Sequence, residues 1–117
     1  MVTTEVEAEV EDPPLLVSAS IEDGSHYAII LVFDKELNAG PLGLSKFVVR
    51  VNGTAVTVVS ADASGTLVVI AVSTAIVSGD VVTVTYNPGV SGSRIVDTLG
   101  NFTSTFSNQP VVNNLVP

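Results

Sequence analysis

The stretch FVVRVNGTAVTV (residues 47–58) decides the fold. Its β-branched residues fall into two short runs, Phe47–Val51 and Thr54–Ser60, on either side of Asn52-Gly53. Both turn residues tolerate a positive φ, and Asn-Gly between alternating apolar residues is the strongest short-range signal for a hairpin. The stretch therefore predicts an antiparallel β-hairpin.

Similar runs continue on both sides of this hairpin, with turn residues between them. Further strands are expected in Leu15–Ile21, His26–Phe33, Thr66–Ser73, Val81–Tyr86 and within Thr103–Val112. The stretch Asp34–Lys46, with Pro41 and two glycines, is expected to cross between sheets. About seven short strands without any helical period predict an all-β fold, an Ig-like antiparallel β-sandwich.

Composition excludes several classes of function. The chain of 117 residues, enough for one domain, carries 12 acidic and 4 basic side chains, a net charge of -8. Binding to nucleic acid or anionic membranes needs clustered Lys and Arg, so neither partner is expected. The apolar runs Tyr27–Phe33 and Leu67–Val72 are far shorter than the ~20 residues of a spanning helix, so no membrane insertion is expected. The absence of cysteine excludes disulfides and thiolate sites.

The negative charge is concentrated at the start of the chain. Residues 1–12 hold five acidic side chains and no basic one, which leaves residues 13–117 with seven acidic and four basic side chains, a net charge of -3. This segment ends at Pro13-Pro14 and predicts an acidic linker, followed by a domain over residues 13–112 and the start of the next linker at 113–117. Val6, Ala8 and Val10 alternate with glutamates, so an extra strand is the alternative.

Several segments together resemble a known repeat. They are Pro13-Pro14-Leu15, LVFDKELN (31–38), FVVRVNGTAVTV (47–58), ASGTLVVIAVSTAIVSGDVVTVTYNPG (63–89) and DTLGN (97–101). The series is similar to the SwmB-type repeat of long bacterial, notably cyanobacterial, surface proteins, and to the broader group of bacterial Ig-like domains. The resemblance implies an Ig-like module repeated in tandem within secreted or surface-displayed stalks and adhesins.

One departure from this repeat suggests a contact surface. If Val68, Ile70 and Val72 face the core together with Tyr27, Ile29, Leu31 and Phe33, apolar residues also face outward. The outward set is Ala28, Ile30, Val32, Leu67, Val69 and Ala71. An Ig-like topology pairs the two strands, so these residues would form one exposed apolar patch, which on a monomer marks a contact surface. The alternative is that the register differs or that a loop covers these residues. Our hypothesis is that the patch is covered by the Val6/Ala8/Val10 face or by another copy of the chain.

Catalytic groups are scarce in the sequence. His26 is the only histidine, and Gly89–Ser93 departs from the nucleophile-elbow pattern at its fifth residue. No phosphate-binding loop is present. No catalytic residues are therefore assigned, and an enzyme is not expected.

The segment Asp97–Asn101 has two interpretations. Asp97 and Asn101 offer hard oxygen ligands and Gly100 permits a sharp turn, so calcium could bind there with Asp12 completing the site. Alternatively, Asp97 and Asn101 cap a turn through bonds from side chain to backbone. The second interpretation needs no cofactor.

Two functions from different classes follow. The first is a non-catalytic structural repeat, a spacer in a large secreted or cell-surface adhesin-like protein, whose partners are neighbouring repeats. The second is a protein-binding or self-associating module that uses the apolar patch. Glycan binding is less favoured, because the chain has no Trp and only Tyr27 and Tyr86.

Overall fold

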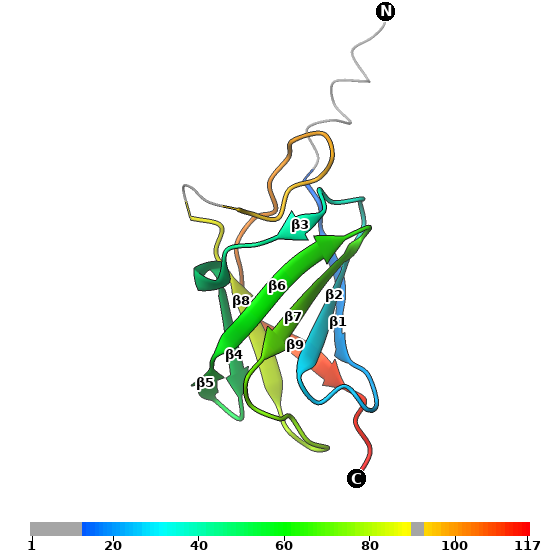
Figure 1. Ribbon diagram of the computed structural model, residues 1–117, viewed down its shortest axis with the longest axis vertical. Coiled ribbons are helices and arrows are strands. Elements are labelled where there is room, and N and C mark those ends of the chain that lie inside the picture. The colour runs from blue at the N-terminus through cyan, green and yellow to red at the C-terminus, as the bar shows by residue number, and fades with distance from the viewer. Residues whose placement is uncertain (1–12, 90–92) are drawn as a thin grey trace, which may run out of the picture.

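The computed structural model describes residues 13–89 and 93–117 (Figure 1). These residues form nine strands and one short 3-10 helix, η1 (Leu44–Lys46), with no α-helix among them. The strands are β1 (Leu16–Ile21), β2 (Ala28–Phe33), β3 (Gly40–Pro41), β4 (Phe47–Val51), β5 (Thr54–Val56), β6 (Val58–Ser64), β7 (Leu67–Val72), β8 (Val82–Tyr86) and β9 (Phe106–Asn113). The prediction of an all-β fold is confirmed for this part of the chain.

The described strands belong to one continuous mixed sheet, in the order β3-β6-β7-β2-β1-β9-β8-β4-β5. The pairings are antiparallel except that of β1 with β9, which is parallel. β9 joins the two halves of the sheet, because it pairs with β1 as well as with β8. The sheet curls until β6 contacts β4, so that β6 and β7 lie in front of β8 and β4 in Figure 1.

This arrangement corrects the prediction of about seven strands in two antiparallel sheets. The expected strand Thr54–Ser60 is divided, since Thr54–Val56 pairs with β4 whereas Val58–Ser64 pairs with β7. Thr57 is therefore the corner at which the chain passes from one half of the sheet to the other. Thr57 is β-branched like its neighbours, so the sequence carried no sign of this corner. The predicted crossover also contains a short strand, β3, which pairs with β6.

The hairpin predicted from Asn52-Gly53 is confirmed. Asn52 has a φ of 52° and Gly53 a φ of 86°, and Arg50 pairs with Ala55 across the turn. Positive φ at both central residues is the property of a type I′ turn, which matches the twist of the flanking strands.

The core lies between the two halves of the curled sheet. Its largest buried side chains are Ile21, Ile29, Leu31, Phe33, Val49, Val68, Ile70, Ile76, Val82, Val84, Tyr86 and Ile95. The rings of Phe47, Tyr86 and Phe106 stack in a row, with centroid distances of 5.1 and 5.6 Å. The expectation that Tyr27 belongs to the core is wrong, because β2 begins at Ala28 and Tyr27, in the preceding turn, is 53% exposed.

Candidate functional site

The outer side of β2 and β7 carries the residues predicted to form an apolar patch. The register pairs Ala28 with Ala71, Ile30 with Val69 and Val32 with Leu67. Paired residues of an antiparallel ladder lie on the same face of the sheet. Leu67 and Val69 are 37% and 38% exposed, whereas the other four side chains are half-buried. We call these six residues the apolar face.

Polar residues border the apolar face on both sides. Ser18 and Ser20 of β1 pair with Val32 and Ile30, and Asp62 and Ser64 of β6 pair with Val69 and Leu67. The apolar face is therefore two strands wide and ends where the neighbouring strands begin. Val6, Ala8 and Val10, one of the two covers hypothesised for this patch, lie outside the described residues.

The opposite outer face of the sheet is more polar. On β8, Val82, Val84 and Tyr86 are buried, while Thr83 and Thr85 alternate with them and are half-buried. Thr83 pairs with the exposed Arg50 and Thr85 with Val48 of β4. The excess of apolar residues is thus a property of one outer face.

The Asp97 loop has the geometry of a capped turn. The Asp97 Oδ1 atom accepts hydrogen bonds from the backbone N–H groups of Leu99 and Asn101, both at 2.9 Å, and Oδ2 accepts one from the Asn101 side chain at 3.1 Å. Burial of the Asp97 carboxyl acts to raise its pKa, but these bonds and the charge of Lys35 outweigh burial and hold the pKa below its usual value. Both oxygens are therefore used within the loop.

Of the three predicted calcium ligands, Asp97 and Asn101 lie together in this loop. Asp97 and Asn101 bond to each other, and Asp12 lies outside the described residues. Within residues 13–89 and 93–117, no group of three or more His, Cys, Asp or Glu side chains could hold a metal ion.

The Asp97 loop belongs to a cluster of bonds that fixes the start of the domain, which we call the N-terminal end. The buried Thr103 hydroxyl donates to the Pro14 carbonyl at 3.1 Å. Leu15 donates its backbone N–H to the Asp34 carboxylate and accepts a bond from the Asp34 N–H. Leu37 pairs with Asp97 in an isolated bridge. These hydrogen bonds hold Pro14 and Leu15, the first residues of the domain, against its loops.

The opposite end, where the chain terminates in Figure 1, is called the C-terminal end here, and side-chain hydrogen bonds at the surface fix it. Asp80 accepts bonds from the Val77 N–H and the Asn52 side chain, and these bonds, in that order, lower its pKa. Asn113 donates to the carbonyls of Val77 and Asp80. Leu115 is buried, so the packed part of the chain extends beyond the boundary predicted at residue 112.

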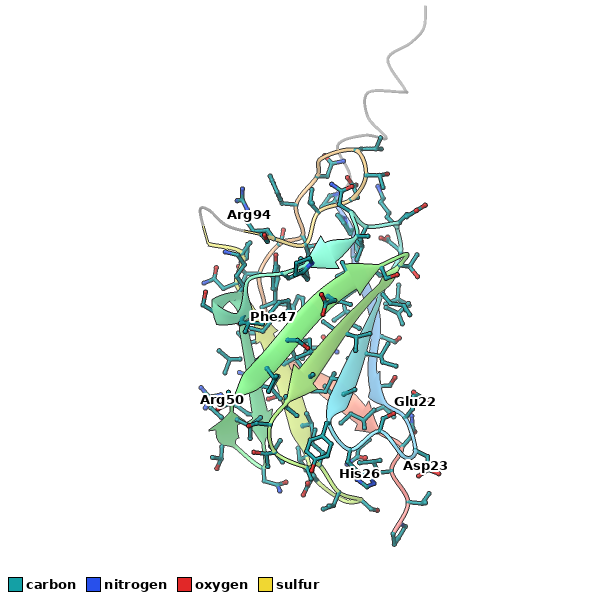
Figure 2. All side chains as sticks on the ribbon, viewed as in Figure 1. Glu22, Asp23, His26, Phe47, Arg50 and Arg94 are labelled. Carbon is teal, nitrogen blue, oxygen red and sulfur yellow. The ribbon has the colours of Figure 1, made fainter. Side chains whose placement is uncertain are left out.

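A pocket of about 320 Å³ opens beside β3 at the N-terminal end. Arg94, whose guanidinium group lies 3.9 Å from the centre of the Phe102 ring, lines it together with Asn38, Gly40 and Ser93, and none of its lining residues is acidic. Figure 2 shows Arg94 at this end and Arg50 near the other. The Arg94 Nε atom is buried without a hydrogen-bond partner among the described residues. No sequence pattern indicated this pocket, because Arg94 and Phe102 meet only in the folded chain.

Arg94 also lies near the buried Tyr86. The Tyr86 hydroxyl accepts a hydrogen bond of 2.9 Å from the Ile95 N–H. Burial raises the pKa of Tyr86, more than the bond from Ile95 and the Arg94 charge lower it. Tyr86 is therefore a neutral packing residue.

At the C-terminal end, the exposed His26 shares a 2.8 Å hydrogen bond with the Ile76 carbonyl.

Residues 9–91 match the family model of the SWM repeat, described as a "putative flagellar system-associated repeat". The match covers more than half of the 117 residues. The chain belongs to this family. The resemblance to the SwmB-type repeat is thereby confirmed. The match includes both strands of the apolar face, whereas Arg94, the Asp97 loop and β9 follow it in the chain.

The SWM repeat shares its fold with two solved structures. It matches the N-terminal part of the bacterial S-layer protein SbsC with a TM-score of 0.71 and 20% identity, covering 94% of this chain and 26% of that one. It matches the S-layer protein rSbsC(31-844) with a TM-score of 0.67 and 20% identity, covering 94% and 15%. The SWM repeat thus spans about a quarter or less of these chains. The search of the curated proteins found no match. No helix of the described residues is long and apolar enough to cross a membrane.

Proposed function

We propose that this chain is a non-catalytic structural repeat, a spacer in a long secreted or cell-surface bacterial protein. The observation that carries the proposal is the placement of the first and last strands. β1 leads away from the N-terminal end and β9 leads to the C-terminal end, and the two strands pair in parallel (Figure 1). Neighbouring repeats would then attach at opposite ends of the module.

This pairing suits a module that carries tension. Pulling the two ends apart draws β1 and β9 in opposite directions along their common ladder, so several hydrogen bonds are loaded together rather than one after another. The pairing of Ser20 with Val112 and Ile21 with Asn113 is extended by a 2.9 Å bond from the Asn114 N–H to the Ile21 carbonyl. Membership of the repeat family and the S-layer fold support the same function.

Force spectroscopy on a tandem of identical copies tests this proposal. Asn114→Pro removes the N–H that bonds to Ile21, whereas the matched control Asn114→Ala keeps it. We expect the proline variant to unfold at a lower force than the alanine variant, after correction for any difference in their urea stability. Equal unfolding forces would show that the β1–β9 ladder carries no load and would contradict the proposal.

The apolar face favours a second candidate function, self-association with another copy of the chain. The exposed Leu67 and Val69 are the side chains that a partner would cover. Sedimentation velocity across a concentration series should show association that the Leu67→Thr, Val69→Thr variant loses and the control Val48→Thr, on the other outer face, retains. Threonine is β-branched and suits a strand, so both substitutions remove apolar surface without disfavouring β7. A monomer at all concentrations contradicts this candidate.

Adhesion through a glycan has less support. The exposed aromatic side chains of the described residues are Tyr27 and Phe102. Tyr27 directly follows His26, whereas Phe102 contacts Arg94, and His26 and Arg94 lie at opposite ends of the module (Figure 2). Glycan sites usually present aromatic side chains side by side, so one sugar could not stack on both.

A further inference from the structure

The Arg94 pocket has the properties of a carboxylate site, and it does not depend on the proposed spacer function. The guanidinium group is already positioned, because its Cζ atom lies over the Phe102 ring, 3.9 Å from the ring centre. A stacked arginine loses little freedom when it binds, and its planar fork matches a carboxylate with two parallel hydrogen bonds. Asn38 and Ser93 supply further polar groups beside it.

The Arg94 Nε atom is unusual, because it is buried and has no hydrogen-bond partner among the described residues. Buried polar groups are nearly always hydrogen-bonded, so an orphaned Nε atom points to an acceptor that belongs there. The domain from residue 13 onward has seven acidic side chains and only four basic ones. None of those seven acids lines the pocket. A positive charge left without an acid, in a domain with an excess of acids, is complementary to an acidic segment from outside it.

The acidic segment, residues 1–12, is followed in the sequence by Pro13 and Pro14, and the described contacts of Pro14 lead to this pocket. Pro14 is held by the Thr103 hydroxyl at 3.1 Å, and Thr103 directly follows Phe102, the residue on which Arg94 stacks. Glu11 and Asp12 stand only three and two residues before Pro14. At ~3.3–3.6 Å per residue, an extended chain reaches about 7 Å from Pro14 to Asp12 and about 10 Å from Pro14 to Glu11.

We propose that the Arg94 pocket binds a carboxylate of the acidic segment of the same chain, from Glu11 or Asp12. The ion pair would fix the direction in which the acidic segment leaves the domain. A linker with a fixed direction sets the angle between this domain and a preceding segment, whereas a free linker sets no angle.

Paramagnetic relaxation in the full chain tests this proposal. Because the chain has no cysteine, Ala8→Cys carries a nitroxide label at a single place. We expect broadening of the Asn38, Gly40 and Phe102 amides beside the pocket but not of β5 at the far side of the C-terminal end (Figure 1). Arg94→Gln should reduce the bound fraction by about two- to five-fold, the effect expected of a partly exposed ion pair.

Three comparisons make the outcome decisive. Arg50→Gln makes the same change of charge away from the pocket and should leave the broadening intact (Figure 2). The double variant Glu11→Gln, Asp12→Asn leaves the packed domain unchanged and should reduce the broadening as Arg94→Gln does. Mixing labelled chains with isotope-enriched unlabelled ones should give no broadening.

Broadening that is absent in the native sequence, or that survives both the Arg94 and the Glu11/Asp12 variants, overturns the proposal. Broadening in the mixed sample identifies a second copy as the occupant and overturns the intramolecular pairing as well. None of these outcomes bears on the load-carrying role of β1 and β9, so the two proposals can fail separately.

Discussion

The N-terminal and C-terminal ends of the repeat are fixed by the same kinds of hydrogen bond in different surroundings. At the N-terminal end, Thr103 and Asp97 are buried, and their side chains bond to backbone groups of the Pro14 and Asn101 segments. At the C-terminal end, Asp80 and Asn52 make similar bonds at the surface. A polar group that is buried costs more free energy when it loses its partner than one that water can reach. The N-terminal end should therefore tolerate changes less well.

The largest effect is expected from Asp97→Ala. This change leaves the Leu99 and Asn101 N–H groups without their acceptor and should lower the free energy of unfolding by about 1–3 kcal/mol. The matched change Asp80→Ala at the C-terminal end should lower it less, because water can replace the lost bonds. Urea denaturation followed by far-UV circular dichroism measures both. Equal losses would contradict the distinction between the two ends.

Acid should act on the same carboxylate with a smaller effect. The pKa of Asp97 is lowered in the folded state, so its ionised form adds stability above the unfolded pKa of ~3.9. That stability is lost as the pH falls through the folded pKa. Urea midpoints measured from pH 6 to pH 2 should fall less steeply for Asp97→Asn than for the native sequence. Asp80, whose pKa is also lowered, titrates in both proteins, so parallel curves would show that Asp97 does not contribute.

Thr103→Val tests a single buried hydrogen bond. Valine keeps the branched shape of threonine but cannot donate to the Pro14 carbonyl, so a loss of about 1 kcal/mol is expected. The control Thr85→Val removes an exposed acceptor of the Asn108 N–H and should cost less. Thermal melts of the two variants give the comparison. A larger loss for Thr85→Val would place the critical bonds on the outer face of β8 rather than at the N-terminal end.

The sequence predicted the features of this fold that depend on neighbouring residues. Asn52-Gly53 placed the hairpin, and period-2 alternation placed Val68, Ile70 and Val72 in the core and Leu67 and Val69 outside it. These features follow from local backbone preference and from the alternation of side chains along a strand.

The features that the sequence did not predict depend on contacts between distant residues. The pairing of β9 with β1 joins segments some 90 residues apart, and Arg94 meets Phe102 through the path of an irregular loop. The two-residue β3 is too short to show any alternation, so its pairing with β6 could not be predicted from the sequence either. At the candidate sites, the turn at Asp97 was one of two interpretations, and the bonds of Asp97 favour it over a ligand set.

Calcium should have the smallest effect, and we expect no change in the melting temperature between EDTA and millimolar calcium. Ligand binding stabilises a fold only in proportion to the free energy of binding. Calcium requires six to eight oxygen ligands, whereas the oxygens of Asp97 already accept bonds from Leu99 and Asn101. An ion there would have to break the bonds that hold the N-terminal end. A rise in melting temperature that saturates with calcium and disappears in Asp97→Ala would instead show that the ion replaces these bonds. The stability of the N-terminal end, unlike that of the C-terminal end, would then depend on the calcium concentration.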